Sequence, residues 1–181
     1  MADRADMVAA YIHAKDCNRP WLMRQTFLAD ARLEMVNRSE AISFPSNADG
    51  VDAISEILVE QFNRDNQNVY TVCLAAAPDG AGDSFSCNWL VAMSRRDTGE
   101  VRVGCGQYDW QFAPDRGLLV SSLRITIDVM EVLASRHSEP VLSWVSALPY
   151  PWCPIGKAEK GVPGLEELKP IIKFLNDQAD S

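Results

Sequence analysis

A carboxylate and an arginine near the end of a long alternating segment are the first candidates for chemistry. Residues 123–130 alternate apolar and polar side chains, so Arg124 and Asp128 share one face of an expected strand. A nearby arginine favours the ionised form of a carboxylate, which can then orient a water molecule or act as a general base. The same pattern fits a polar outer face of a sheet whose other face is buried, and both interpretations stay open.

The residues that usually build metal and cofactor sites are not grouped in this chain. His13 and His137 lie far apart in the sequence, and the five cysteines contain no Cys-x-x-Cys pair. A zinc site would need closer sets of ligands. Gly104-Cys105-Gly106 lacks the third glycine and the following helix of a dinucleotide-binding loop. We therefore expect neither a metal nor a cofactor.

Charge and composition narrow the class of partner. The chain has 181 residues and a net charge of −8, and its longest basic run is Arg95-Arg96. Nucleic acids and anionic membrane surfaces attract basic patches, so neither is an expected partner. The odd number of widely spaced cysteines favours a reducing compartment. Because no apolar leader and no stretch of about 18 apolar residues is visible, we expect a cytoplasmic protein.

Helices are expected first and most strands later, as in an α+β domain. Apolar residues recur at helical spacing in residues 3–16, 20–28 and 51–62. Alternation predicts short strands at residues 31–36 and 41–44, and four longer strands between residues 69 and 130. Consecutive antiparallel strands after a helical start favour α+β over a parallel α/β fold. Gly104 and Gly106 fall where bulges would curve such a sheet.

The last part of the chain differs in character. Six of the ten prolines lie between Pro140 and Pro170, and they interrupt an aromatic run at residues 144–152. We therefore divide the chain into an α+β domain at residues 1–136 and a Pro/aromatic-rich extension at residues 137–181. The extension is expected to be an extended segment that packs on the domain or on a partner subunit, followed by a short terminal helix.

Four short segments together resemble the nuclear transport factor 2-like superfamily, especially its bacterial SnoaL-like branch. They are Tyr11-Ile12-His13-Ala14, residues 27–34, residues 50–54, and Tyr108-Asp109-Trp110-Gln111-Phe112. Their order and spacing carry the resemblance, which covers residues 5–133.

The resemblance implies a cystatin-like α+β cone. A curved antiparallel (mixed) sheet would wrap around three helices from the N-terminal half and leave an apolar ligand-binding pocket at the wide end. It also implies a homodimer that pairs through the outer face of the sheet. The superfamily includes ketosteroid isomerases, polyketide cyclases, epoxide hydrolases and scytalone dehydratase, and also binding modules without chemistry. The fold alone therefore does not decide the function.

The resemblance also implies roles for single residues. Tyr11 matches the tyrosine that stabilises an oxyanion in the isomerases, and Tyr108 stands near their protonated aspartate and could donate a second hydrogen bond. Met35 replaces their general-base aspartate, and because a thioether cannot abstract a proton, ketosteroid isomerisation is disfavoured. Asp128 lies near the active-site aspartate of the epoxide hydrolases. Asp109 faces away from Tyr108 unless the strand register shifts by one residue.

Two hypotheses follow. In the first, the protein is a cofactor-independent isomerase, cyclase, dehydratase or hydrolase acting on a small apolar carbonyl, enol or epoxide compound. The expected catalytic residues are then Tyr11, Tyr108, Asp109 and Asp128, and the expected ligand-binding residues are Met35, Trp89, Trp110 and Arg124. In the second, the protein is a non-catalytic ligand-binding or dimeric interaction module. A cavity with convergent hydroxyls and carboxylates favours the first hypothesis, and an apolar or filled interior favours the second.

Overall fold

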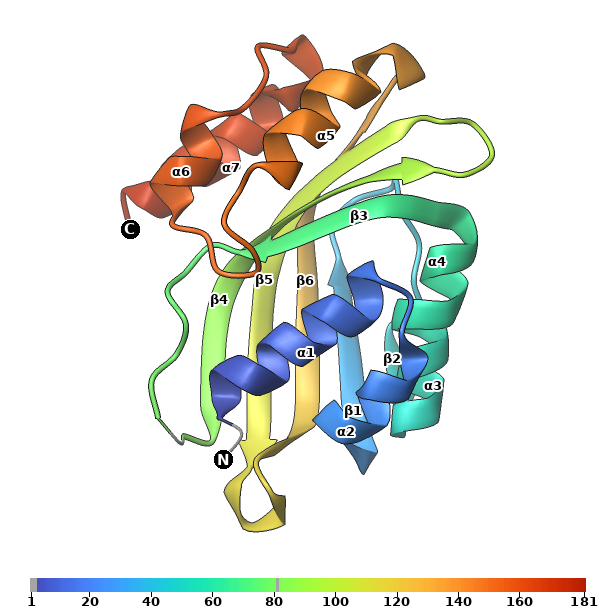
Figure 1. Ribbon diagram of the computed structural model, residues 1–181, viewed down its shortest axis with the longest axis vertical. Coiled ribbons are helices and arrows are strands. Elements are labelled where there is room, and N and C mark those ends of the chain that lie inside the picture. The colour runs from blue at the N-terminus through green and yellow to red at the C-terminus, as the bar shows by residue number, and fades with distance from the viewer. Residues whose placement is uncertain (1–2, 81) are drawn as a thin grey trace.

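A curved six-stranded sheet with helices on both faces forms the protein (Figure 1). The computed structural model describes residues 3–80 and 82–181. The strands are β1 (Phe27–Asn37), β2 (Asn47–Asp49), β3 (Asn66–Cys73), β4 (Ser84–Arg95), β5 (Val101–Ala113) and β6 (Leu119–Leu133). They lie in the order β2-β1-β6-β5-β4-β3, with β1 and β6 parallel and the other neighbours antiparallel. The predicted α+β class with a curved mixed sheet is confirmed.

The N-terminal helices cover the inner face of the sheet. They are α1 (Arg4–Asp16), a 3-10 turn with α2 (Pro20–Leu22 and Met23–Thr26), and one continuous helix made of α3 (Val51–Ser55), a π-helical segment (Glu56–Gln61) and α4 (Phe62–Asp65). Helix α1 begins with a capping box in which Asp3 and Asp6 satisfy each other's backbone N–H groups. The inner core lies between these helices and the sheet.

The C-terminal helices cover part of the outer face. Helices α5 (Ser138–Ser146), α6 (Ile155–Lys160) and α7 (Lys169–Ala179) lie together at one end of the sheet, away from α1 (Figure 1). They enclose a second core with the outward-facing residues Leu90, Val103 and Leu133. The indole of Trp144 anchors this layer, because its Nε1 donates to the Ala158 carbonyl at 3.0 Å. Short 3-10 turns occur at Pro114–Arg116, Ser135–His137 and Glu166–Leu168.

A bulge curves the sheet beside a glycine, as predicted for Gly106. The pairing of β5 with β6 shifts between Cys105 and Gly106, so that Asp128 has no register partner. A Cβ atom at Gly106 would lie 1.8 Å from the Thr126 carbonyl oxygen, so the backbones can approach this closely only at a glycine.

Several local predictions were wrong. Residues 27 and 28 begin strand β1 rather than end a helix, because both side chains are needed in the inner core. Residues 41–44 are irregular, and the short strand lies at Asn47–Asp49 instead. Residues 138–146 form a helix rather than an extended segment. The division at residue 136 stays a prediction, and residues 1, 2 and 81 of the first part lie outside the described residues.

No helix in residues 3–80 and 82–181 is both long and apolar enough to cross a membrane. All five cysteines are free thiols, and four of them are buried.

Candidate functional site

A small cavity lies between α1, the helix of residues 51–65 and the inner face of the sheet. Its volume is about 50 Å³. Most of its lining is apolar, namely Met35, Ile42, Phe44, Leu58, Phe62, Val91, Met93, Ile125, Ile127 and Met130. Its polar groups come from Tyr11, Lys15, Trp89 and Tyr108. The interior is thus nearly filled, with polar groups from both a helix and the sheet.

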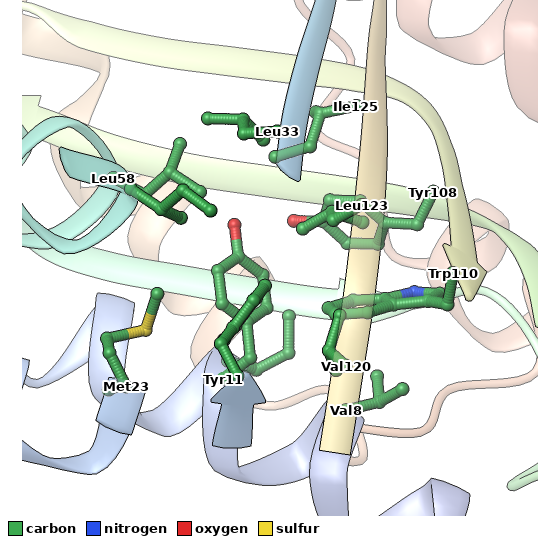
Figure 2. Close-up of a cluster of buried hydrophobic side chains, with 14 of the residues drawn as sticks. Val8, Tyr11, Met23, Leu33, Leu58, Tyr108, Trp110, Val120, Leu123 and Ile125 are labelled. Atoms are coloured by element: carbon green, nitrogen blue, oxygen red, sulfur yellow. The ribbon is translucent and has the colours of Figure 1, made fainter. Parts of the chain in front are cut away.

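The two predicted tyrosines meet inside this cavity. Tyr11 projects from α1 and Tyr108 from β5, and their rings pack edge to face with centroids 5.9 Å apart. Figure 2 shows their hydroxyl groups pointing toward one another, near Leu58 and Ile125. Tyr11 is fully buried, yet its hydroxyl has no hydrogen-bond partner of normal geometry among the described residues. A buried donor of this kind is uncommon in folded proteins.

Burial controls the protonation of both tyrosines. Loss of water around the ring raises the pKa of Tyr11 well above the usual tyrosine value, and the neighbouring Tyr108 hydroxyl offsets this only in part. Burial likewise raises the pKa of Tyr108, and the proximity of Tyr11 adds to the rise. Both groups therefore stay protonated and can donate hydrogen bonds at neutral pH.

The indole of Trp89 is a third donor at the cavity. Trp89 projects from β4 and packs against Tyr108, with ring centroids 5.6 Å apart. Its Nε1 is buried and has no acceptor among the described residues. Trp110 also has an unpartnered Nε1, but it lies in the core behind Tyr11 and is not part of the cavity lining.

Lys15 is a site residue that the sequence analysis missed. It lies four residues after Tyr11 on α1, so both side chains share one helix face. Its Nζ donates to Asp16 Oδ1 at 2.8 Å and to Thr71 Oγ1 at 2.6 Å. It also lies 5.0 Å from the centre of the Phe62 ring, within cation–π range. The signal in the sequence was a lysine at helical spacing within an otherwise apolar face.

Asp16 holds this lysine from outside the cavity. Its Oδ1 also accepts from Thr71 Oγ1 at 2.8 Å. Its Oδ2 accepts from the Thr71 backbone N–H at 2.7 Å and from the Tyr150 hydroxyl at 3.1 Å. Only 2% of the Asp16 side chain is exposed. The network therefore ties α1, β3 and the segment after α5 to one buried ion pair.

The loop between β1 and β2 (residues 38–46, called the β1–β2 loop below) closes one side of the cavity. Ile42 and Phe44 from this loop line the cavity and are only partly buried. Asn37 Nδ2 donates to the Ile42 carbonyl at 2.6 Å. At the start of the loop, Arg38 pairs with Asp128 at 2.5 Å and donates its backbone N–H to the Ile127 carbonyl. Asp128 thus contacts the loop and is not part of the cavity lining.

Two other predicted residues lie on the opposite face of the sheet. Asp109 accepts hydrogen bonds from Ser86 at 2.6 Å and from Gln107 at 2.9 Å. Arg124 pairs with Glu34 at 2.8 Å. Asp109 and Arg124 both line an open groove of about 790 Å³ on the outer face. The structure therefore brings Tyr11, Tyr108, Trp89 and Met35 together and separates them from the predicted carboxylates.

No family model matches the sequence, and no curated protein matches it. Solved structures do match. A nuclear transport factor 2-like superfamily protein from Salmonella enterica serovar Typhimurium is 16% identical, with a TM-score of 0.54 over 69% of this chain and 88% of that one. The chain has the nuclear transport factor 2-like fold.

Two further structures with this fold carry ligand names. A protein from Catenulispora acidiphila with a ketosteroid isomerase-like fold, solved with trimethylamine, is 14% identical, with a TM-score of 0.51 over 68% of this chain and 85% of that one. A computationally designed 17-OHP binder is 13% identical, with a TM-score of 0.54 over 70% of this chain and 95% of that one. At these identities the likeness establishes the nuclear transport factor 2-like fold alone, and the SnoaL-like branch stays a prediction.

The chemistry of the site must therefore be read from its own side chains. Within the described residues, the cavity lining contains hydroxyl, indole and ammonium groups but no carboxylate, and no cluster of potential metal ligands is present. Such a lining can donate hydrogen bonds to an oxygen atom and surround an apolar body.

Proposed function

We propose that the inner cavity binds a small, mostly apolar carbonyl, enol or epoxide compound, and that Tyr11 and Tyr108 donate hydrogen bonds to its oxygen. The observation that carries this proposal is the buried Tyr11 hydroxyl, which faces Tyr108 but has no hydrogen-bond partner of normal geometry among the described residues. Leaving a buried donor unpaired costs about 1–3 kcal/mol. A ligand oxygen would supply the missing acceptor, and the apolar lining would hold the rest of the molecule.

Binding requires the cavity to expand. Sites for drug-sized ligands occupy roughly 300–1,000 Å³, whereas this cavity measures about 50 Å³. The β1–β2 loop is the part most easily displaced, because Ile42 and Phe44 are only partly buried and belong to no regular element. We propose that the ligand enters by moving this loop outward.

Two functions fit such a site. Protonated Tyr11 and Tyr108 could polarise a carbonyl or stabilise an enolate, as an isomerase, cyclase or dehydratase would require. Proton transfer by Asp109 or Asp128 would need a rearrangement, because Asp128 pairs with Arg38 and Asp109 lies on the outer face. The second candidate, a non-catalytic ligand-binding module, is favoured by the lack of a carboxylate in the described lining.

The proposal is tested by titrating the full-length protein with small aromatic ketones and following the ligand by NMR. We expect saturable binding that weakens about tenfold in Tyr11→Phe and in Tyr108→Phe, the loss expected for one buried hydrogen bond. Tyr70→Phe is the matched control, because Tyr70 is exposed on β3. Unchanged affinity in both cavity variants would contradict the proposal.

We also propose a homodimer that uses the uncovered part of the outer face. The C-terminal helices cover one part of this face, and the uncovered part carries Arg32, Glu34, Asp109 and Arg124. A second copy could pair with this polar part. Arg124→Glu would place like charges beside Glu34, so it should shift a dimer toward monomer in sedimentation, whereas Lys173→Glu on α7 should not. A wild-type monomer at all concentrations would rule the dimer out.

We also propose that the protein is located in the cytoplasm. The five free cysteines fit a reducing compartment, since thiols in oxidising compartments usually pair. Fractionation of cells that express the tagged full-length chain tests this expectation.

A further inference from the structure

The polar groups of the cavity are matched to a hydrogen-bond acceptor. The Lys15 ammonium and the Trp89 indole can only donate hydrogen bonds, and both line the cavity. The Trp89 Nε1 and the Tyr11 hydroxyl are buried without acceptors among the described residues. Burial also keeps Tyr11 and Tyr108 protonated. The lining thus offers several donors from three elements and, in the described part of the chain, no carboxylate.

Lys15 makes this donor set positively charged. Two protein oxygens, Asp16 Oδ1 and Thr71 Oγ1, accept from its Nζ. An ammonium has three N–H donors, so one remains. The Nζ lies over the ring of Phe62, which itself lines the cavity. The remaining donor can therefore turn toward a ligand in the cavity.

Asp16 balances the charge of Lys15, but only the cationic member of this pair lines the cavity. Asp16 is not part of the cavity lining. Its two carboxylate oxygens accept four hydrogen bonds, one from Lys15, one from Tyr150 and two from Thr71. These donors stabilise the carboxylate where it lies and keep Lys15 in one position. The ammonium is therefore the charged group that the cavity presents.

We propose that the ligand of this cavity carries an anionic oxygen, a carboxylate or an enolate-like oxyanion, which binds against Lys15 and the Tyr11 hydroxyl. This rests on the proposed function and adds to it the charge of the ligand. Lys15 is then a specificity-determining residue, since it separates an oxyanion from a neutral compound of the same shape.

The experiment compares charged and neutral probes of matched shape on the full-length protein. Phenylacetate is paired with phenylacetamide, and 4-nitrophenolate with 4-nitrotoluene, so the two pairs distinguish a carboxylate from a delocalised oxyanion. Binding is followed by ligand-observed NMR. The wild type should bind at least one anion about tenfold more tightly than its neutral partner, as expected for a charge-assisted hydrogen bond.

The variant Lys15→Met/Asp16→Asn removes both charges together, so no buried carboxylate is left without its cation. We expect the preference for the anion to fall to about twofold or less, while the neutral probe keeps its affinity. Tyr150→Phe is the matched control, because it removes a hydrogen bond from Asp16 without touching the cavity lining. The anion preference should survive in this control.

The outcomes separate the two proposals. If the wild type binds charged and neutral probes equally and Tyr11→Phe weakens both, the anion inference fails and the proposed function stands. If the preference survives in Lys15→Met/Asp16→Asn, the anion binds elsewhere and the inference also fails. If no probe or ketone binds the wild type or the more open variant Phe44→Ala, both proposals fail.

Discussion

A buried hydroxyl without a partner gives up its hydrogen bonds to water and gains none in return, at a cost of about 1–3 kcal/mol. Tyr11 carries such a hydroxyl among the described residues, and its ring packs edge to face against the ring of Tyr108. Such a hydroxyl can take its missing acceptor from a ligand or from a bound water molecule. The free energy of unfolding of a tyrosine-to-phenylalanine variant therefore reports on the site even before a ligand is known.

Tyr11→Phe should raise the free energy of unfolding by about 1 kcal/mol, because it removes the unpaired polar atom and keeps the ring. Tyr150→Phe should lower it by about 1 kcal/mol, because the Tyr150 hydroxyl donates to Asp16 at 3.1 Å. Urea denaturation of the two variants beside the wild type measures both effects. A loss of stability in Tyr11→Phe would mean that its hydroxyl is paired in solution.

The buried thiol and phenol groups predict a steep loss of stability at high pH. Burial raises the pKa of Cys105 above its ordinary value of 9.0 and those of Tyr11 and Tyr108 above 10.0. When the pH rises above the ordinary pKa values, these groups lose their protons in the unfolded chain but keep them in the folded chain. Rising pH therefore favours unfolding. Their contribution to stability is complete below about pH 9 and decreases steadily above it.

Chemical denaturation at a series of alkaline pH values measures this dependence. The double variant Tyr11→Phe/Cys105→Ala should show a shallower decrease, because two of the titrating groups are gone. Equal slopes for the variant and the wild type would show that these groups are not the source of the alkaline instability.

Only some of the side chains that line the cavity could be predicted from the sequence. Tyr11 and Tyr108 were predicted from the family resemblance, and the structure brings both side chains to the inner cavity. Lys15 was missed because a lysine normally marks a solvated face, and its partner Thr71 lies 56 positions away in the chain. Ion pairs between distant segments leave no signal in one sequence.

At the scale of elements, the β1–β2 loop decides whether the cavity is open or closed. Phe44→Ala should enlarge the cavity and cost about 1–2 kcal/mol, because the lost ring is only partly buried. The variant should bind the aromatic ketones faster and more tightly than the wild type does. Ser43→Ala, an exposed change in the same loop, should leave both properties unchanged. Stopped-flow binding compares the three proteins, and identical rates would exclude this loop as the entrance.

A bulge explains why the position of Asp128 was not predicted correctly, whereas Asp109 faces away from Tyr108 as the alternation of β5 predicted. Strand alternation placed Asp128 on the same face as Arg124, but the bulge at Gly106 shifts the phase of β6. Ile127 and Met130 both face the inner core, whereas Val129 packs with the outer one. Asp128 thereby reaches Arg38 at the end of β1. A glycine in a strand suggests a bulge, but it does not tell which opposing residue is displaced.

At the scale of the whole molecule, one sheet separates two cores. The inner core is shared with α1 and the helix of residues 51–65, and the outer core with α5, α6 and α7. The alternation of the long strands predicted the sheet. Strand β4 buries Trp89 on one side and Leu90 on the other. This apolar content of both faces indicates a packed layer on each side of the sheet, a signal that the sequence analysis did not use.

The outer core is formed by side chains from both the sheet and the C-terminal helices. We therefore expect that residues 1–136 do not fold well without residues 137–181. Removing the extension would expose the outer apolar residues, among them Leu90, Val101, Val103 and Leu133, on a single patch. Large exposed apolar patches lead to association or aggregation. The full-length chain should therefore unfold in one cooperative transition, and a chain that ends at residue 136 should be insoluble or unfolded.

A single substitution tests the same coupling without truncation. Trp144 fills the space between α5 and Gly161 and donates to the Ala158 carbonyl, so Trp144→Ala should cost about 3–5 kcal/mol. Lys157→Ala, an exposed change on α6, should cost almost nothing. If the two parts form one cooperative unit, Trp144→Ala lowers the protection of amide hydrogens in α1 and β1 as much as in α7. Loss of protection confined to residues 137–181 would instead show that the extension unfolds separately, and would support the division at residue 136.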